Sequence, residues 1–148
     1  MSDDILSVIP VDPEYVPDHP AQQMGQALFS SFVSKADEVN MIVYDEVHFI
    51  DPGANFNSVA CPVCGADLSA WWQDAMQAAY EQQFADLTVT TPCCGSTGSL
   101  NDLTYDWPAG FASFVLQARN PVIDVNDAQL GMLASMLKCQ LRKVWTRA

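Results

Sequence analysis

The chain has 148 residues, of which 49% are hydrophobic and only 16% charged, a composition typical of one globular domain with a buried core. Its formal net charge of −12 disfavours binding to nucleic-acid phosphates or anionic membranes and favours a basic partner. No apolar run approaches the roughly 20 residues of a membrane helix. The start MSDDILSVIP lacks the features of a secretory signal, so we expect a cytoplasmic protein.

Residues 1–20 are expected to form an extended N-terminal arm. Prolines at positions 10, 13, 17 and 20 break helices and favour an extended course. The apolar residues of the arm predict that it lies along the domain, with a partner-binding segment as the alternative. Residues 21–148 are expected to be a single zinc-binding α+β domain.

The first half of that domain predicts a helix, a strand and a second helix. Pro20 suits a first helical turn, and apolar residues recur every four positions as far as about residue 34. The stretch EVNMIVYDEVHFI alternates as a strand, with a bend near Asp45–Glu46. Trp72, Met76, Tyr80 and Phe84 are spaced as in an amphipathic helix over 70–84, with Ser69 as its N-cap.

The second half predicts a short strand over 87–91, a hairpin over 103–118, a helix and a last strand. Asn126 with Gln129 resembles a capping box at the start of that helix. Without the arm and first helix, the order is compatible with an antiparallel sheet carrying helices on one face, a ferredoxin-like split β-α-β fold. The arm and first helix are then additions to it.

Four of the five cysteines lie in two short stretches, CPVCG at Cys61–Gly65 and PCCG at Pro92–Gly95. A C-x-x-C turn supplies two of the four soft ligands that zinc prefers, and the glycine allows the backbone to reverse. The first stretch closely resembles the knuckle of zinc-ribbon proteins. Over these two stretches only, the resemblance implies a structural Zn²⁺ held by Cys61, Cys64, Cys93 and Cys94, and it implies no activity.

The second pair is less regular, because neighbouring residues of an extended strand point to opposite faces. Both Cys93 and Cys94 reach one metal ion only if the backbone twists there, which Pro92 and Gly95 permit. If one of them does not bind, His48 or Cys139 could supply the fourth ligand. Redox chemistry at the C-x-x-C and unliganded thiols are the other interpretations.

The charge is uneven. Residues 1–118 hold 16 acidic residues and one base, Lys35, whereas residues 119–148 hold two acids and five bases, giving balances of −15 and +3. We expect a zinc-stabilised acidic protein that binds a basic partner, such as an immunity protein or inhibitor of a nuclease-like toxin. Asp45, Glu46, Asp102 and Asp106 are candidates for the binding face.

Two other classes of function stay open. A thiol oxidoreductase or zinc hydrolase would use the cysteines, although no phosphate loop, nucleophile elbow or His-rich hydrolase motif is present. A nucleic-acid-binding zinc ribbon would use Arg142, Lys143 and Arg147, against the negative balance elsewhere.

Overall fold

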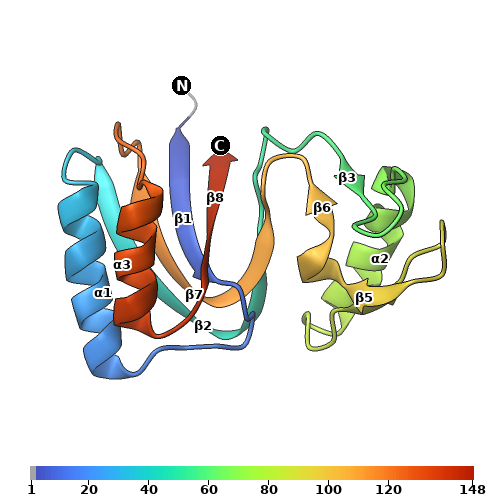
Figure 1. Ribbon diagram of the computed structural model, residues 1–148, viewed down its shortest axis with the longest axis horizontal. Coiled ribbons are helices and arrows are strands. Elements are labelled where there is room, and N and C mark those ends of the chain that lie inside the picture. Colours follow the sequence, from blue (N-terminus) through green and yellow to red (C-terminus); the bar gives the residue numbers. More distant parts are fainter. Residues whose placement is uncertain (1–2) are drawn as a thin grey trace.

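The computed structural model describes residues 3–148, in which three α-helices, one 3-10 helix and eight strands form (Figure 1). The elements in chain order are β1 (Asp4–Pro10), α1 (His19–Phe32), β2 (Glu38–Ile50), β3 (Val59–Ala60), α2 (Ser69–Glu81), β4 (Thr88–Thr90), β5 (Thr97–Ser99), η1 (Leu100–Asp102), β6 (Thr104–Tyr105), β7 (Gly110–Arg119), α3 (Asp127–Leu137) and β8 (Leu141–Arg147). Within the described residues, no helix has the length and apolar character needed to cross a membrane.

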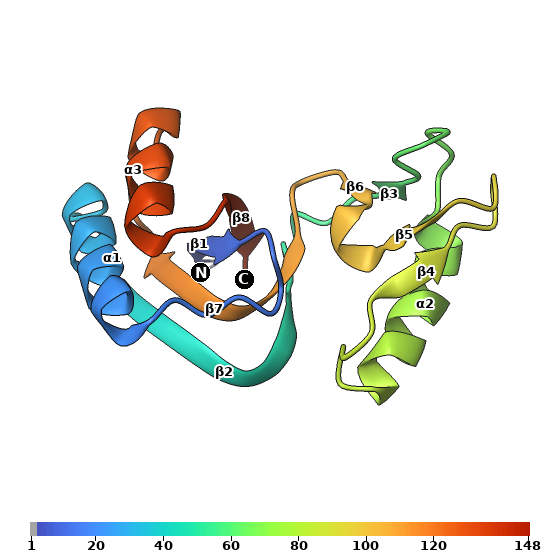
Figure 2. The ribbon, with the colours of Figure 1, turned by 60° about the horizontal axis from the view of Figure 1, so that its bottom comes forward.

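The main sheet has four strands in the order β2-β7-β1-β8, and every neighbouring pair is antiparallel. β1 and β2 therefore run parallel with β7 between them, and α1 connects them. β7 and β8 likewise run parallel to each other, with β1 between them, and α3 connects β7 to β8. Both helices lie side by side over one face of the sheet (Figures 1 and 2). The prediction of an α+β fold with an antiparallel sheet is confirmed.

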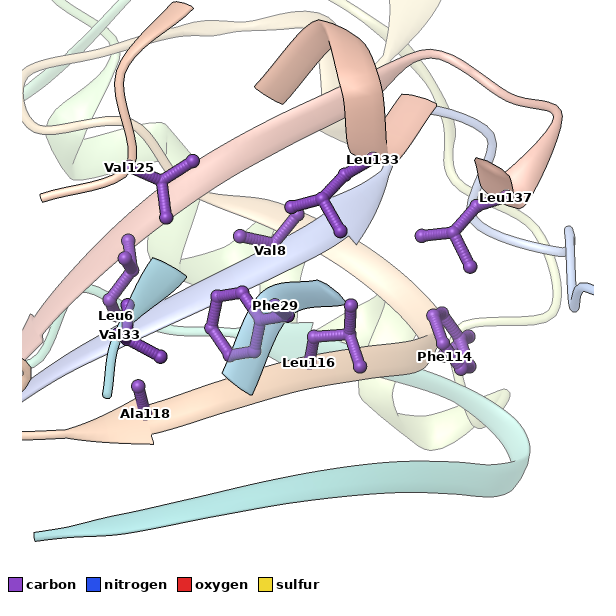
Figure 3. Packing of buried hydrophobic residues seen from close by; sticks show 10 residues of the cluster. All are labelled: Leu6, Val8, Phe29, Val33, Phe114, Leu116, Ala118, Val125, Leu133 and Leu137. Atoms are coloured by element: carbon purple, nitrogen blue, oxygen red, sulfur yellow. The ribbon is translucent and has the colours of Figure 1, made fainter. Parts of the chain in front are cut away.

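The principal core lies between this face and the two helices (Figure 3). Alternate residues of β1 and β7 point toward the helices, because side chains along a strand alternate between faces. The fully buried members of the cluster are Leu6, Val8, Phe29, Val33, Phe114, Leu116, Ala118, Val125, Leu133 and Leu137. They come from residues 6–33 and 114–137, on either side of a long intervening segment, so the sheet–helix unit is complete only when the N-terminal and C-terminal parts of the chain meet.

The sheet curls strongly, which also buries part of its second face. A register shift between Val43 and His48 bends β2 (Figure 2), as the sequence predicted near Asp45–Glu46. The chain leaving β2 then reaches the opposite edge, where the backbone N–H of Ala54 donates to the carbonyl of Arg147 in β8 (2.9 Å). This contact brings the two edges of the sheet close to closure.

Residues 51–109, between β2 and β7, form a separate part that we call the inserted lobe (Figure 1). It holds α2, η1 and the two small sheets β3-β6 and β4-β5. Aromatic rings join it to the main sheet: Phe49 of β2 lies 5.9 Å from Trp72 of α2, and Phe111 of β7 lies 5.3 Å from Phe84, between ring centroids. The lobe therefore has its own apolar cluster, which is continuous with the main sheet.

A polar junction also fixes the lobe. Asn101 of η1 is only 4% exposed; its side-chain amide donates to the carbonyl of Val11 (2.7 Å) and its oxygen accepts from the backbone N–H of Phe111 (3.0 Å). The guanidinium of Arg142 in β8 donates to both oxygens of Asn101 and to the carbonyl of Ala109. One buried asparagine thus connects the lobe, the sheet and the segment after β1.

Three sequence predictions about the elements are wrong. Residues 4–10 and the first helix are not additions, because β1 pairs with both β7 and β8 and α1 covers the sheet; residues 1 and 2 of the predicted arm lie outside the described residues. The hairpin over 103–118 does not form, since β6 pairs with β3 while β7 pairs with β1 and β2. Ser69 does not cap α2, because its hydroxyl donates to Asp67 and the N-cap is Leu68.

Candidate metal centre

The first cysteine turn follows β3 and is closed by its own backbone. The N–H of Cys61 donates to the carbonyl of Ala66, and the N–H of Gly65 donates to the carbonyl of Cys61, both at 2.9 Å. Gly65 has φ +77°, a left-handed conformation that residues with a Cβ adopt at a cost. The N–H of Val63 points at the sulfur of Cys61 (3.4 Å). The chain reversal thus turns Cys61 and Cys64 toward one point.

The second turn joins β4 to β5 and resolves the difficulty of the adjacent cysteines. Residues 91–95 form a turn and not an extended strand, and Gly95 has φ +71°. Successive side chains of a turn need not point to opposite faces, as they do in a strand. Cys93 and Cys94 both face the first turn, as the sulfur positions show.

The structure brings together all four predicted cysteines, whose Sγ atoms lie within 4.8 Å of one another. The separations are 3.7 Å for Cys61–Cys94, 3.9 Å for Cys93–Cys94 and 3.2 Å for Cys64–Cys93. Four sulfurs bound to zinc at about 2.3 Å lie about 3.8 Å apart in a regular tetrahedron. Since all five cysteines are free thiols, the donor atoms and their spacing fit a tetrahedral metal ion.

The two alternative ligands lie elsewhere. His48 stacks on Tyr44 near the end of β2, with ring centroids 3.8 Å apart. Cys139 lies in the turn between α3 and β8 and packs against the principal core. Neither belongs to the group of close metal-ligating side chains found in residues 3–148.

Hydrogen bonds around the sulfurs favour thiolates at two of the four positions. Backbone amides of Cys64 and Val63 lower the pKa of Cys61. Hydrogen bonds from the hydroxyls of Ser96 and Thr91 lower the pKa of Cys94 to about 6. The pKa of Cys93 is raised to about 12, mainly because its thiol shares a hydrogen bond with Cys64. A metal ion would displace that proton, since coordinating thiols are deprotonated outright.

The surroundings of the cysteines offer little space for a substrate. Cys61 is 2% exposed and belongs to the apolar cluster of the lobe, whereas the other three cysteines lie at the surface. The cavity beside Cys61 and Thr91 measures about 40 Å³, far below the roughly 300 Å³ of small-molecule sites. Four sulfurs around one metal ion would leave no open coordination position for a substrate or a water molecule.

Comparisons with protein-family models, with curated proteins and with solved structures find no match to this chain. The geometry of the cysteine cluster is therefore the principal evidence about its chemistry.

The sequence reasoning missed two hydroxyl groups beside the sulfurs. Thr91 Oγ1 lies 3.5 Å from the sulfur of Cys94 and 3.9 Å from that of Cys61, and Ser96 Oγ lies 3.2 Å from Cys94. Both residues border the second turn. The signal for Thr91 was present in the sequence, because Thr-Pro precedes Cys93 much as Cys-Pro opens the first turn.

Proposed function

We propose that the four cysteines hold a structural zinc ion and that the protein acts by binding a basic protein partner. The observation that carries the metal proposal is the convergence of four thiol groups, from turns 29 to 33 residues apart, at tetrahedral spacing. Zinc is the metal that such closed four-cysteine sites most often hold in stabilising roles. The ion would tie the β3 end of the lobe to its β4-β5 sheet.

The charge of the inserted lobe supports a basic partner. Its 59 residues include no lysine, arginine or histidine and seven acidic residues, all exposed: Asp51, Asp67, Asp74, Glu81, Asp86, Asp102 and Asp106. The lobe therefore carries −7 of the net −12, and the other 89 residues carry −5. Zinc with four thiolates adds two further negative charges. A field of one sign over one lobe steers oppositely charged proteins toward it.

The bases proposed for nucleic-acid binding are largely engaged within the fold. Arg142 donates to Asn101 and Ala109 at the junction. Lys143 contacts the carboxylate of Asp124 at 3.1 Å and the carbonyl of Val125. These contacts favour a protein partner over a nucleic acid, because phosphate binding needs free cationic side chains.

We further propose that the protein is cytoplasmic, because thiols stay reduced in that compartment. As a binding protein, it would be an inhibitor or an immunity protein for a basic toxin. Enzymatic use of the cysteines is the less favoured reading, given the closed ligand set. We also infer that β1-α1-β2 and β7-α3-β8 are two interlocked split β-α-β units of ferredoxin-like type, a class supported by the strand order. The inserted lobe then lies between the two units.

Charge reversal on the lobe tests the partner proposal. Asp74 and Glu81 lie seven residues apart on the exposed side of α2, so Asp74→Lys with Glu81→Lys changes the lobe by +4 without touching the core. We expect the zinc-loaded protein to recover a basic protein from native cell extract, with association slowing as salt rises. The double variant should associate roughly 10-fold or more slowly.

The control is Asp127→Lys on α3, which is exposed and lies outside the lobe. It should leave association largely unchanged. Recovery of nucleic acid alone, or association that is indifferent to salt and to the double substitution, would mean that the charge only keeps the protein dispersed.

A further inference from the structure

The two cysteine turns repeat one backbone pattern at a constant offset of 30 residues. Cys61 N–H donates to the carbonyl of Ala66, and Thr91 N–H donates to the carbonyl of Ser96, both at 2.9 Å. The closing hydrogen bonds from Gly65 and Gly95 are also both 2.9 Å. Outside them, the bridge between Ala60 and Asp67 corresponds to the pair Thr90 and Thr97. The two turns are thus the same local structure.

This correspondence assigns a position to each residue of the second turn. Cys94 matches Cys64, the second ligand position. Thr91 matches Cys61, the first ligand position, and the two residues are similarly buried, at 4% and 2% exposure. Cys93 matches Val63, a position that is 70% exposed in the first turn and contributes no ligand there.

We infer that the second turn is a two-ligand knuckle whose first ligand position is occupied by Thr91, and that Cys93 supplies the fourth ligand from the third position instead. The inference rests on the proposed metal site and specifies how it is built. Cys93 is exposed, and its sulfur lies 3.2 Å from that of Cys64. The site therefore combines one regular and one displaced pair of ligands.

Thr91 then acts as a positioning residue and not as a ligand. Its hydroxyl lies 3.5 Å from the sulfur of Cys94 and 3.3 Å from the carbonyl of Ser96, to which it donates. Metal-bound thiolates only accept hydrogen bonds, so with a metal bound the single hydroxyl proton of Thr91 would turn from the carbonyl of Ser96 to the sulfur of Cys94. Partners of this kind orient ligands, and their loss typically weakens metal binding by about 10–100-fold.

The exchange of ligand positions gives a direct test with the full-length protein. Cys93→Ser should weaken zinc binding by more than about 100-fold, beyond the range for an orienting partner. Adding Thr91→Cys to Cys93→Ser should restore affinity to within about 10-fold of the wild type, because the new sulfur would occupy the position that Cys61 has in the first turn. Zinc competition titration measures affinity, and cobalt substitution reports the number of bound thiolates.

The single variant Thr91→Cys keeps every native cysteine and so avoids loss of folding through a missing ligand. In the zinc-loaded wild type, Cys93 should resist alkylation; in Thr91→Cys, the new ligand should release Cys93, which should then label rapidly and be located by peptide mass mapping. Continued protection of Cys93, or a double variant that folds but does not regain zinc, overturns the inference.

Two other outcomes separate this inference from the proposed metal site. Wild-type protein that binds zinc while Cys93→Ser binds it equally well would leave the metal site intact and remove Cys93 as a ligand. Wild-type protein that binds no zinc would remove both.

Discussion

Asn101→Ala is the substitution that most directly probes how the inserted lobe is attached. The change removes three hydrogen bonds of the side chain, to Val11, Phe111 and Arg142. The guanidinium of Arg142 still donates to the backbone carbonyls of Asn101 and Ala109, so its charge keeps hydrogen-bond acceptors after the substitution. The carbonyl of Val11 and the N–H of Phe111 lose the partners that the side chain provides.

The expected cost follows from these two groups. A buried polar group without a partner costs about 1–3 kcal/mol. Phe111 is fully buried, whereas Val11 is half-buried, so water can compensate part of the loss there. We expect Asn101→Ala to lower the free energy of unfolding by about 2–4 kcal/mol. The midpoint of thermal unfolding should fall by about 6–12 °C for a chain of this length.

Urea unfolding at one fixed excess of zinc is the suitable assay. A difference in free zinc concentration between samples would itself change the measured free energy of unfolding. The matched control is Asn57→Ala, an exposed residue of the same lobe whose amide donates only to Asp106 (2.7 Å). It should change the stability by less than about 0.5 kcal/mol. Equal effects of the two substitutions would refute the view that Asn101 anchors the lobe.

Three further predictions concern the core, the sheet edge and the fifth cysteine. Phe29→Ala should cost about 3–5 kcal/mol in urea unfolding, because the ring is fully buried between α1 and the sheet. Gly53→Ala should lower the free energy of unfolding by more than about 1 kcal/mol, because Gly53 has φ +63° and an added Cβ would meet the carbonyl of Arg147. Gly98→Ala is the control and should not destabilise the protein to this extent, because a Cβ at Gly98 would lie in open space. Burial raises the pKa of Cys139 to about 11, so its alkylation at pH 8 should be about 100-fold slower than that of an ordinary thiol and accelerate as pH rises toward 11.

Local patterns predicted the elements well, and long-range pairing lay beyond them. The capping box of Asn126 and Gln129 and the bend in β2 are confirmed, because both depend on neighbours in sequence. The prolines at positions 10, 13, 17 and 20, which end and follow residues 4–10, favour an arm by composition alone. Their partners in β7 and β8 lie more than 100 residues away, and no local signal identifies them.

The hairpin prediction failed for a related reason. Pro108-Ala109-Gly110 has the composition of a turn, and the preceding Trp107 adopts φ +66°. The bend instead carries the chain from the lobe into the main sheet, so the strands on either side pair with different partners. Composition predicts a change of direction, while tertiary contacts decide what pairs across it.

The cysteine cluster was predicted from motif chemistry, and its convergence is confirmed as four close thiols. The positions of the cysteines alone do not show that Thr91 is equivalent to Cys61. The shared Pro-x-Cys-Gly spacing, at residues 62–65 and 92–95, would have revealed it.

The metal content of the purified protein tests the central proposal most directly. Protein prepared under reducing conditions without chelator should contain about one zinc ion per chain by elemental analysis and native mass spectrometry. The Cys64→Ser variant should lose that ion, because the substitution removes one of the four ligands. Cys139→Ser, which changes the cysteine outside the cluster, should retain it. Wild-type protein that folds without stoichiometric zinc, even after incubation with excess metal, would contradict the proposal.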